Sequence, residues 1–219
     1  IRPRDWSSDV CSSDLGSESI ALPPPLPSSW SYAHPEPTRA LLVDEYLDDD
    51  RNTVARRGLS LRRRTLSHRD NDGVPAERDA SATTYWIKGR EPAEGALHSR
   101  LERQLRGLDD PALAAAIGER GGVAPSLAVR ASLRQDRASW VVRHRSGVTG
   151  TLSIDRVSGA ALGVEVSWSE LEVEIHAQEA QAATLAAELD GALMILPFLT
   201  PSTIAKIDRA TLLATRKSG

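Results

Sequence analysis

Apolar and polar residues alternate most regularly over residues 168–176. Three glutamates occupy every second position there: Glu170, Glu172 and Glu174. Apolar side chains fill the positions between them: Leu171, Val173 and Ile175. Successive side chains of a strand point to opposite faces, so the pattern predicts a strand with three carboxylates about 7 Å apart on one face. On an inward face such like charges stay ionised only beside cations, whereas an outward face would be solvated or paired with arginines.

Shorter stretches of the same kind predict a chain built mainly of antiparallel strands. We expect strands over residues 40–48, 59–65, 83–88, 126–134, 138–145, 149–156 and 163–176. The polar residues 67–82 contain Asp72-Gly73 and predict a long exposed loop between two of these strands. Apolar residues spaced three and four apart predict amphipathic helices over residues 95–118 and 178–195. Residues 201–217 are expected to form a short tail with a final helix that starts at Pro201-Ser202.

Charged and polar residues share one face in several of these strands. The pairs that share a face are Arg62 with Arg64, Trp86 with Lys88, Arg130 with Arg134, and Ser153 with Asp155. The opposite faces carry apolar residues such as Leu152 and Ile154, which the predicted helices can cover. The economical arrangement is an α+β fold: a closed antiparallel β-barrel with a polar lumen and helices outside.

Composition restricts the class of protein. The 219 residues suit a medium-sized domain with a sizeable core, and the net charge of −3 argues against a general nucleic-acid binder. The single cysteine, Cys11, excludes a disulfide framework and a thiolate metal site. No apolar run reaches the roughly 18 residues that span a membrane. Richness in Ala and Arg is typical of a GC-rich bacterial genome, and we expect a cytoplasmic protein.

The first fifteen residues resemble the conceptual translation of a common sequencing adapter, most clearly over residues 5–15. We therefore expect residues 1–15, Cys11 included, to be non-native, and we leave them out of the predicted fold. Residues 16–39 are rich in proline and predict an irregular leading segment with a truncated first strand. Residues 40–219 are expected to form one domain.

Five short motifs follow one another in an order that resembles the CYTH domain. They are Tyr46-Leu47-Asp48, Gly58 to Arg64, Trp86-Ile87-Lys88-Gly89, Leu152-Ser153-Ile154-Asp155 and Glu170-Leu171-Glu172-Val173-Glu174. The CYTH domain defines the triphosphate tunnel metalloenzyme superfamily, which includes inorganic triphosphatases, thiamine triphosphatases and class IV adenylate cyclases. The resemblance covers roughly residues 40–216 and implies a closed eight-stranded antiparallel tunnel.

The resemblance also implies roles for individual residues. Phosphate oxygens would be bound by five basic side chains: Arg62, Arg64, Arg137, Arg134 as the alternative to Arg137, and Lys206. Lys88 and Asp155 match catalytic positions. A divalent metal, Mg²⁺ or Mn²⁺, would be held by Glu170 and Glu172, with Glu174 as the third candidate.

One departure from the family pattern concerns the amino-terminal strand, which carries Glu-x-Glu-x-Lys in the family. The nearest segment here, residues 18–22, retains only Glu18. Truncation of the gene or degeneration of the strand would each explain the loss. The first would be compatible with an enzyme once the native start is restored, and the second would favour a binding protein.

We therefore expect metal-dependent hydrolysis of a triphosphate or polyphosphate compound inside a charged tunnel. The alternatives are a binding module for polyphosphate or an organophosphate, and an adenylate cyclase of the same superfamily. Interpretations without a phosphate or metal site also stay open. Residues 62–64 could form a solvated or nucleic-acid-facing patch, the glutamate row could be an exposed strand face, and Lys88 could be a surface lysine beside Trp86. The expected partner is a small phosphate compound, without membrane or nucleic acid, and the oligomeric state is left open.

Overall fold

The computed structural model describes residues 6–12, 23–69, 82–89, 102–119, 126–177, 179–193, 199–201 and 206–218. The described strands are β1 (Trp6–Ser12), β2 (Trp30–Tyr32), β3 (Thr38–Asp48), β4 (Leu59–Arg69), β5 (Ala82–Gly89), β6 (Glu102–Leu105), β7 (Ala128–His144), β8 (Thr149–Ala161), β9 (Val164–His176) and β10 (Leu199–Pro201). The helices are α1 (Thr53–Arg56), α2 (Pro111–Glu119), α3 (Glu179–Leu193) and α4 (Lys206–Ser218). No helix in this part of the chain is both long enough and apolar enough to span a membrane.

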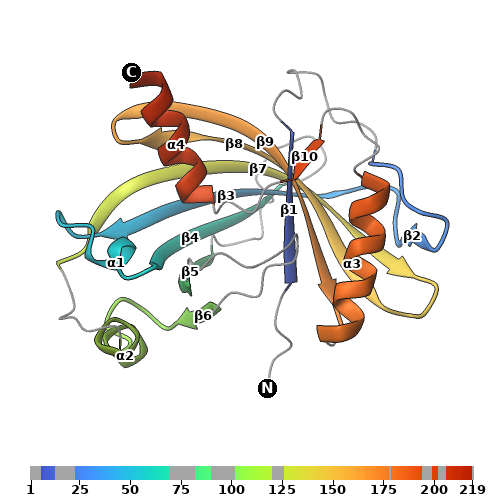
Figure 1. Cartoon of the computed structure of the whole chain (residues 1–219), viewed down its shortest axis with the longest axis horizontal. Helices are drawn as coiled ribbons and strands as arrows, with labels where there is room; N and C mark the ends of the chain where they lie inside the picture. The colour runs from blue at the N-terminus through green and yellow to red at the C-terminus, as the bar shows by residue number, and fades with distance from the viewer. Residues whose placement is uncertain are drawn as a thin grey trace.

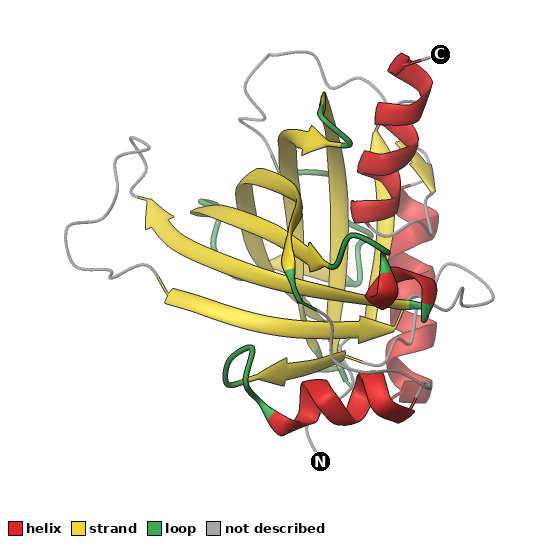
Figure 2. Ribbon diagram, turned by 90° about the vertical axis from the view of Figure 1, so that its left-hand side faces the viewer, coloured by secondary structure: helices red, strands yellow, loops and turns green. Residues whose placement is uncertain are grey.

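The strands form one curved antiparallel sheet (Figures 1 and 2). Its order is β10-β1-β9-β8-β7-β3-β4-β5-β6, and β2 pairs with β7. Eight strands have four residues or more, as expected, and β2 and β10 have three each. The expected closure of the barrel is not confirmed, because no ladder joins β10 to β6 within the described ranges. Both end strands are short, so neither offers a long edge to the other.

The three longest strands change the face that they bury. In β7, the buried side chains of the first half are Ala131, Leu133 and Gln135, and those of the second half are Ala138, Trp140 and Val142. The strand itself continues without a break in its register with β8. The expectation of two strands separated near residue 136 was therefore wrong: one strand passes between helices that cover opposite faces of the sheet.

Different helices cover the two faces. We call the face that carries Arg62, Arg137 and Glu170 the inner face, and the opposite one the outer face. Helix α3 packs on the outer face of β7–β9 through apolar residues three and four apart, and α2 packs on the outer face of β4–β6. Helix α4 lies at the other end of the sheet from α3 (Figure 1), against apolar residues of the inner face such as Leu133 and Val157. One helix is thus not outside the sheet as expected, because that end of the inner face is apolar.

The region before β7 differs from the helix expected over residues 95–118. Residues 102–105 are strand β6, and the helix begins only at Pro111. Proline is favoured at a first helical position, and the Asp110 carboxylate accepts a hydrogen bond from the Ala112 amide at 2.9 Å. These two residues start α2, and Leu105 belongs to β6; residues 95–101 of the expected helix lie outside the described residues.

The amino-terminal segment also differs from expectation. Residues 6–12 belong to the segment that was left out of the predicted fold. They form β1, and every residue of β1 pairs with a residue of β9. An unpaired edge of β9 would present a row of free backbone N–H and C=O groups, and an extended segment satisfies them whatever its origin. The resemblance of this segment to an adapter stays a prediction.

Candidate functional site

The inner face brings together charged side chains from strands that are far apart in the sequence. In the register, Arg64 lies opposite Asp44, and Arg137 lies opposite Asp155, which in turn lies opposite Glu170. The sheet curves around this face, and α4 covers one end of it (Figure 2). The inner face is apolar where α4 packs on it, and its charged side chains lie next to Lys206, the first residue of α4.

Three carboxylates form what we call the acidic cluster: Asp155, Glu170 and Glu172. One carboxylate oxygen of each lies within 4.8 Å of those of the other two. Asp155 and Glu170 are buried, and Glu172 is half-buried. Hard carboxylate oxygens in such a group suit Mg²⁺ or Mn²⁺, so the donor set fits the metal that the sequence predicted.

Two cations neutralise the acidic cluster. Arg137 donates from Nε to Asp155 Oδ1 at 2.7 Å, and from Nη2 to Asp155 Oδ2 at 2.6 Å and to Glu172 Oε2 at 2.5 Å. The Lys206 ammonium contacts all three carboxylates and lies 3.2 Å from Asp155 Oδ2. Burial alone would raise the pKa of Asp155, but Arg137 and Lys206 together hold it below its ordinary value. The two cations thus stabilise the charged form of Asp155 at the centre of the cluster.

Glu170 has further partners outside the cluster. Its Oε2 accepts a hydrogen bond from Trp168 Nε1 at 2.9 Å and lies 3.9 Å from Arg209 Nη1. Arg209 belongs to α4, as Lys206 does. Two cationic side chains from the first turn of α4 thus contact the acidic cluster. These contacts hold the start of α4 against the sheet.

A second buried group surrounds Asp44, and we call it the Asp44 cluster. The fully buried Asp44 carboxylate accepts hydrogen bonds from Arg64 Nε at 2.6 Å, Arg64 Nη2 at 2.7 Å, Gln135 Nε2 at 2.6 Å and Arg62 Nη1 at 3.4 Å. Burial would raise the pKa of Asp44, but the two arginines and the amide lower it well below its ordinary range. The carboxylate thus holds two guanidinium groups against the inner face.

Two polar atoms of the Asp44 cluster have no hydrogen-bond partner within the described part of the chain: Arg62 Nε and Gln135 Oε1. Buried polar atoms are nearly always satisfied, so an unmatched guanidinium N–H on the inner face needs an acceptor. A phosphate oxygen is the acceptor that guanidinium groups suit best. This observation fits an anion bound beside Arg62.

Four residues do not fit the interpretations without a phosphate or metal site. Arg62 and Arg64 lie on the inner face with Asp44, so they are not part of a solvated or nucleic-acid-facing patch. Glu170 and Glu172 contact Lys206 on the inner face, so they are not an exposed glutamate row. Lys88 lies opposite Ser60 in the register, two residues along β4 from Arg62, which places it on the same face as the arginines.

Two of the expected residues do not join the clusters. Arg134 lies on the outer face opposite Ser158, with 49% of its side chain exposed and Asp136 as its partner at 3.7 Å. This corrects the expectation that Arg134 faces the lumen: β7 presents Gln135 and Arg137 there instead. Glu174 lies opposite Thr151 on the inner face but is not one of the three clustered carboxylates.

Asp44 and Gln135 were not identified from the sequence. A signal did exist for Asp44, because aspartate is disfavoured within strands and this one shares a face with Tyr46 of a recognised motif. No sequence pattern indicated Gln135, because the alternation of apolar and polar residues breaks at this point, where β7 changes the face that it buries. Residues 18–22 lie outside the described residues, and it is β1 that pairs next to the acidic cluster, with Asp9 opposite Glu172 and Cys11 opposite Glu170.

Comparison with known proteins agrees with the fold. The PH1819 protein of Pyrococcus horikoshii OT3 has a similar structure, with 14% identity, a TM-score of 0.55, and coverage of 94% of this chain and 97% of that one. HpAC1 from Hippeastrum, a proposed adenylyl cyclase reported to have a dominant triphosphatase activity, has 17% identity, a TM-score of 0.53, and coverage of 95% and 97%. No curated protein sequence matches the chain. The CYTH domain model matches residues 30–209, and the chain therefore belongs to the CYTH domain family.

Proposed function

We propose that this protein hydrolyses a triphosphate or polyphosphate compound on the inner face of its sheet, with Mg²⁺ or Mn²⁺ held by the acidic cluster. The observation that carries the proposal is the pairing of two buried groups on one face. The acidic cluster offers carboxylate oxygens within 4.8 Å of one another, and the Asp44 cluster offers a buried guanidinium N–H that has no partner among the described residues. A phosphate chain with its metal needs both kinds of group.

Each group has a distinct part in this proposal. Arg62 and Arg64 bind phosphate oxygens, and Asp44 holds their guanidinium groups in place before the substrate arrives. Lys88, on the same face, adds positive charge to the phosphate chain. Asp155, Glu170 and Glu172 would hold the metal, which would supply positive charge beside the phosphate chain. Preorganised charge of this kind lowers the barrier to phosphoryl transfer without covalent chemistry by the protein.

Asp155 is a metal ligand in this proposal and not a general base. Arg137 and Lys206 lower its pKa, and a carboxylate with a lowered pKa is a weak proton acceptor. Arg137 and Lys206 contact the same carboxylates, so both also lie where they can approach the phosphate chain next to the metal. Arg134, on the outer face, has no part in the proposal.

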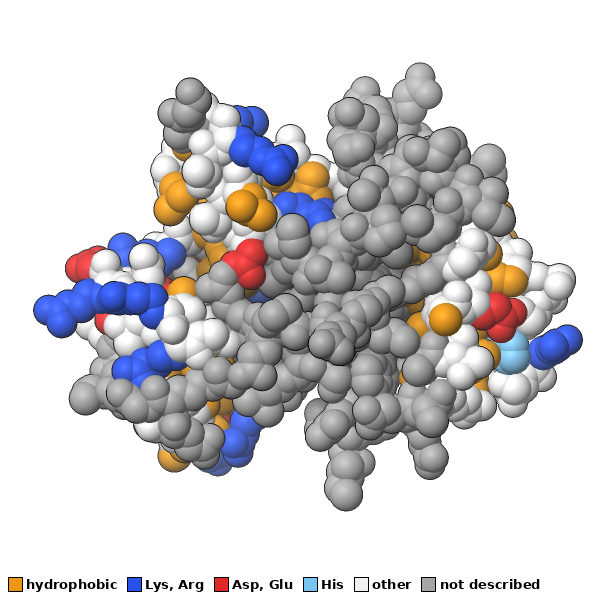
Figure 3. All heavy atoms as spheres, in the orientation of Figure 1, with side chains coloured by type: hydrophobic (Ala, Val, Ile, Leu, Met, Phe, Trp, Pro, Cys, Tyr) orange, Lys and Arg blue, Asp and Glu red, His pale blue; other side chains and the backbone are white. Residues whose placement is uncertain are grey.

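A binding module without turnover is the second candidate. It is favoured by the position of the Lys206 ammonium, which contacts all three clustered carboxylates and so already supplies a cation to them. In that case the arginines would bind the anion and the acidic cluster would only hold α4. A nucleic-acid partner is not favoured, because the net charge of the chain is −3. Described Lys and Arg side chains are visible on both sides of the face seen in Figure 3.

Phosphate release from inorganic tripolyphosphate, with and without Mg²⁺ or Mn²⁺, tests the proposal. We expect release that depends on the metal, that is lost in Arg62→Ala and that is retained in Arg134→Ala, the matched control from the outer face. Thermal unfolding of both variants confirms that they fold. Tight binding of tripolyphosphate without release would establish the binding module, and full activity in Arg62→Ala would refute the assignment of the inner face.

A further inference from the structure

The carbonyl oxygen of Gln135 is a buried acceptor that the proposed phosphate site leaves unmatched. The side chain is fully buried, and its Oε1 has no hydrogen-bond partner among the residues that the structure describes. The orientation of the amide is fixed, because the Asp44 carboxylate only accepts hydrogen bonds and receives one from Gln135 Nε2 at 2.6 Å. Oε1 therefore needs a donor from outside these residues.

A phosphate group cannot be this donor. Ionised phosphate oxygens accept a hydrogen bond from Arg62 Nε, but for the same reason they cannot donate one to Gln135 Oε1. Arg62 Nη1 and Gln135 Nε2 both contact the same oxygen, Asp44 Oδ2, at 3.4 and 2.6 Å. The unmatched donor and the unmatched acceptor are thus held by one carboxylate. A water molecule beside a phosphate on Arg62 is the smallest group that can donate to Oε1.

Gln135 lies between the two charged clusters of the inner face. On β7 it precedes Arg137 by two residues on the same face, a separation of about 7 Å, and Arg137 contacts the acidic cluster. Its own amide belongs to the Asp44 cluster. In the proposed function the phosphate chain lies between the same two clusters. A water held by Gln135 is therefore next to a phosphorus atom of that chain.

The apolar neighbours of Gln135 leave such a water few other partners. Leu133 lies two residues earlier on β7, and Val157 lies opposite Gln135 on β8; both are buried on the inner face. Their side chains cannot form hydrogen bonds with water. The amide oxygen and the phosphate chain thus determine the position and the orientation of the water molecule.

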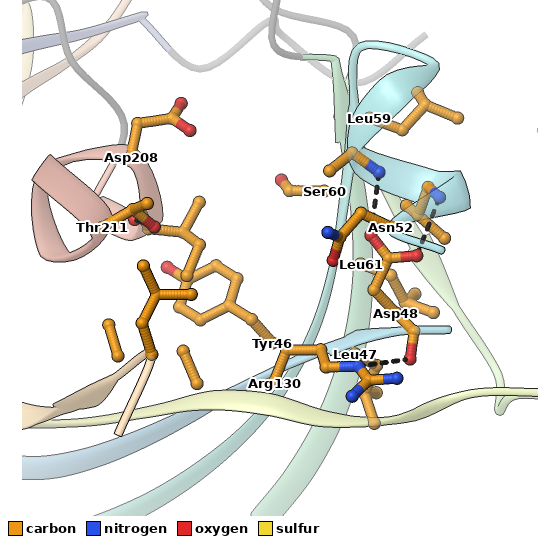
Figure 4. Close-up of a pocket in the computed structure, with 16 residues that line it drawn as sticks. Tyr46, Leu47, Asp48, Asn52, Leu59, Ser60, Leu61, Arg130, Asp208 and Thr211 are labelled. Atoms are coloured by element: carbon orange, nitrogen blue, oxygen red, sulfur yellow. Dashed lines mark hydrogen bonds between the residues drawn. The ribbon is translucent and has the colours of Figure 1, made fainter. Parts of the chain in front are cut away.

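A source of water lies next to the Asp44 cluster. A cavity of about 240 Å³ separates α4 from β3 and β4, and Figure 4 shows the ring of Tyr46 between Asp208 of α4 and Ser60 of β4. Tyr46 follows Asp44 by two residues on the same face of β3, a separation of about 7 Å. The polar side chains on the cavity walls include both an acid, Asp208, and a base, Arg130. The cavity has room for several water molecules.

We propose that Gln135 orients the water that attacks the terminal phosphorus of the substrate, an inference that rests on the proposed hydrolysis of a triphosphate. The water oxygen forms a bond to phosphorus, and the bond from phosphorus to the bridging oxygen breaks with its electron pair going to the leaving diphosphate. Both protons of the water leave on the orthophosphate, so Gln135 accepts a hydrogen bond and no proton. A glutamine amide orients the attacking water in GTPases in the same manner.

The replacement Gln135→Met tests the inference, because it removes the amide and keeps an unbranched side chain of similar length. We expect kcat for tripolyphosphate to fall at least about tenfold and KM to stay within about threefold of the wild type, since Arg62 and Arg64 still bind the phosphate. Asp44→Asn is the comparison: it alters the charge that holds the arginines, so it is expected to change KM. A change of KM alone in Gln135→Met, or no change in either constant, would overturn the inference.

The replacement Gln135→Lys separates the two polar atoms of the amide. The lysine ammonium can donate to Asp44 as Nε2 does, but it offers no acceptor to a water molecule. We expect Gln135→Lys to have a kcat as low as that of Gln135→Met, and thermal unfolding confirms that both variants fold. A kcat restored by the lysine would show that Gln135 acts only through Asp44, and would overturn the inference.

A crystal structure of the wild type with tripolyphosphate gives a test that depends on no variant. We expect an ordered water within hydrogen-bonding distance of both Gln135 Oε1 and the terminal phosphate. A site without this water would overturn the inference even in an active enzyme. A protein that holds tripolyphosphate and this water but releases no phosphate would count against the proposed function, and not against the water site at Gln135.

Discussion

The replacement Asp44→Asn tests the buried charges of the inner face. The fully buried carboxylate accepts three short bonds, at 2.6, 2.7 and 2.6 Å, from Arg64 and Gln135, and a longer one from Arg62. Asparagine keeps one carbonyl acceptor, but its NH₂ group faces other donors. The variant therefore loses about two charge-assisted hydrogen bonds, each worth about 1.5–3 kcal/mol. Breaking a buried ion pair on one side costs about 3–5 kcal/mol, which agrees with that sum.

The neighbouring residue provides the control. Glu45 points to the other face of β3, where its carboxylate accepts a hydrogen bond from Arg63 Nε at 2.5 Å, and both side chains are partly exposed. An exposed pair of this kind contributes about 0–1 kcal/mol, because water screens it. For a chain of this size 1 kcal/mol corresponds to about 2–4 °C in Tm. We expect Asp44→Asn to lower Tm by roughly 6–20 °C and Glu45→Gln by less than about 4 °C.

The dependence on pH and on ligand separates the proposed cause from a general packing defect. The pKa of Asp44 is lowered in the folded protein, so its contribution is present above the unfolded value of about 3.9 and is lost as the pH falls below it. The difference in stability between wild type and Asp44→Asn should thus be largest near pH 7 and shrink in acid. Tripolyphosphate should raise the Tm of the variant more than that of the wild type, because it replaces the missing anion. Urea unfolding at several pH values that gives equal effects for both variants would refute the reasoning.

Two further predictions concern the acidic cluster. Glu172→Gln should abolish the rise in Tm that Mn²⁺ produces in the wild type while leaving the metal-free protein folded, and scanning calorimetry with and without Mn²⁺ measures both. Lys206→Met removes the ammonium that contacts three carboxylates, so it should destabilise the protein at pH 7 and make Mn²⁺ more stabilising than in the wild type. An unchanged response to Mn²⁺ in either variant would contradict the role given to that residue.

The alternation along the strands predicted much of the fold. It located β3, β4, β5, β8 and β9, and the spacing of apolar residues located α3. The final helix was expected to start at Pro201-Ser202, but α4 starts at Lys206, and Pro201 ends β10. The alternation gave a wrong prediction where helices cover opposite faces of the same strand. In β7 the apolar residues change phase at residue 136, which looks like a strand end in the sequence but is only a change of covering helix. The extent of closure was also not predictable, since it depends on how the two end strands meet in space.

The sequence predicted the inner-face charges better than their partners. Arg62, Arg64 and the glutamates of β9 were identified by alternation and by their order along the chain, and Arg137 by the family resemblance alone. The sequence did not show whether Arg134 or Arg137 faces inward. The two residues are three positions apart, so they lie on opposite faces, and only the register with β8 shows which one is on the inner face. Asp44 and the cavity beside Tyr46 depend on contacts between β3, β4 and α4, and such contacts leave no local pattern in a sequence.

The central claim is that the acidic cluster holds a metal next to arginines that bind phosphate. Anomalous X-ray diffraction from crystals grown with Mn²⁺ and tripolyphosphate tests it most directly. The account predicts a manganese peak among Asp155, Glu170 and Glu172, with phosphate density reaching Arg62 Nε. Manganese found only on exposed carboxylates, with Lys206 still in contact with all three clustered residues, would contradict it.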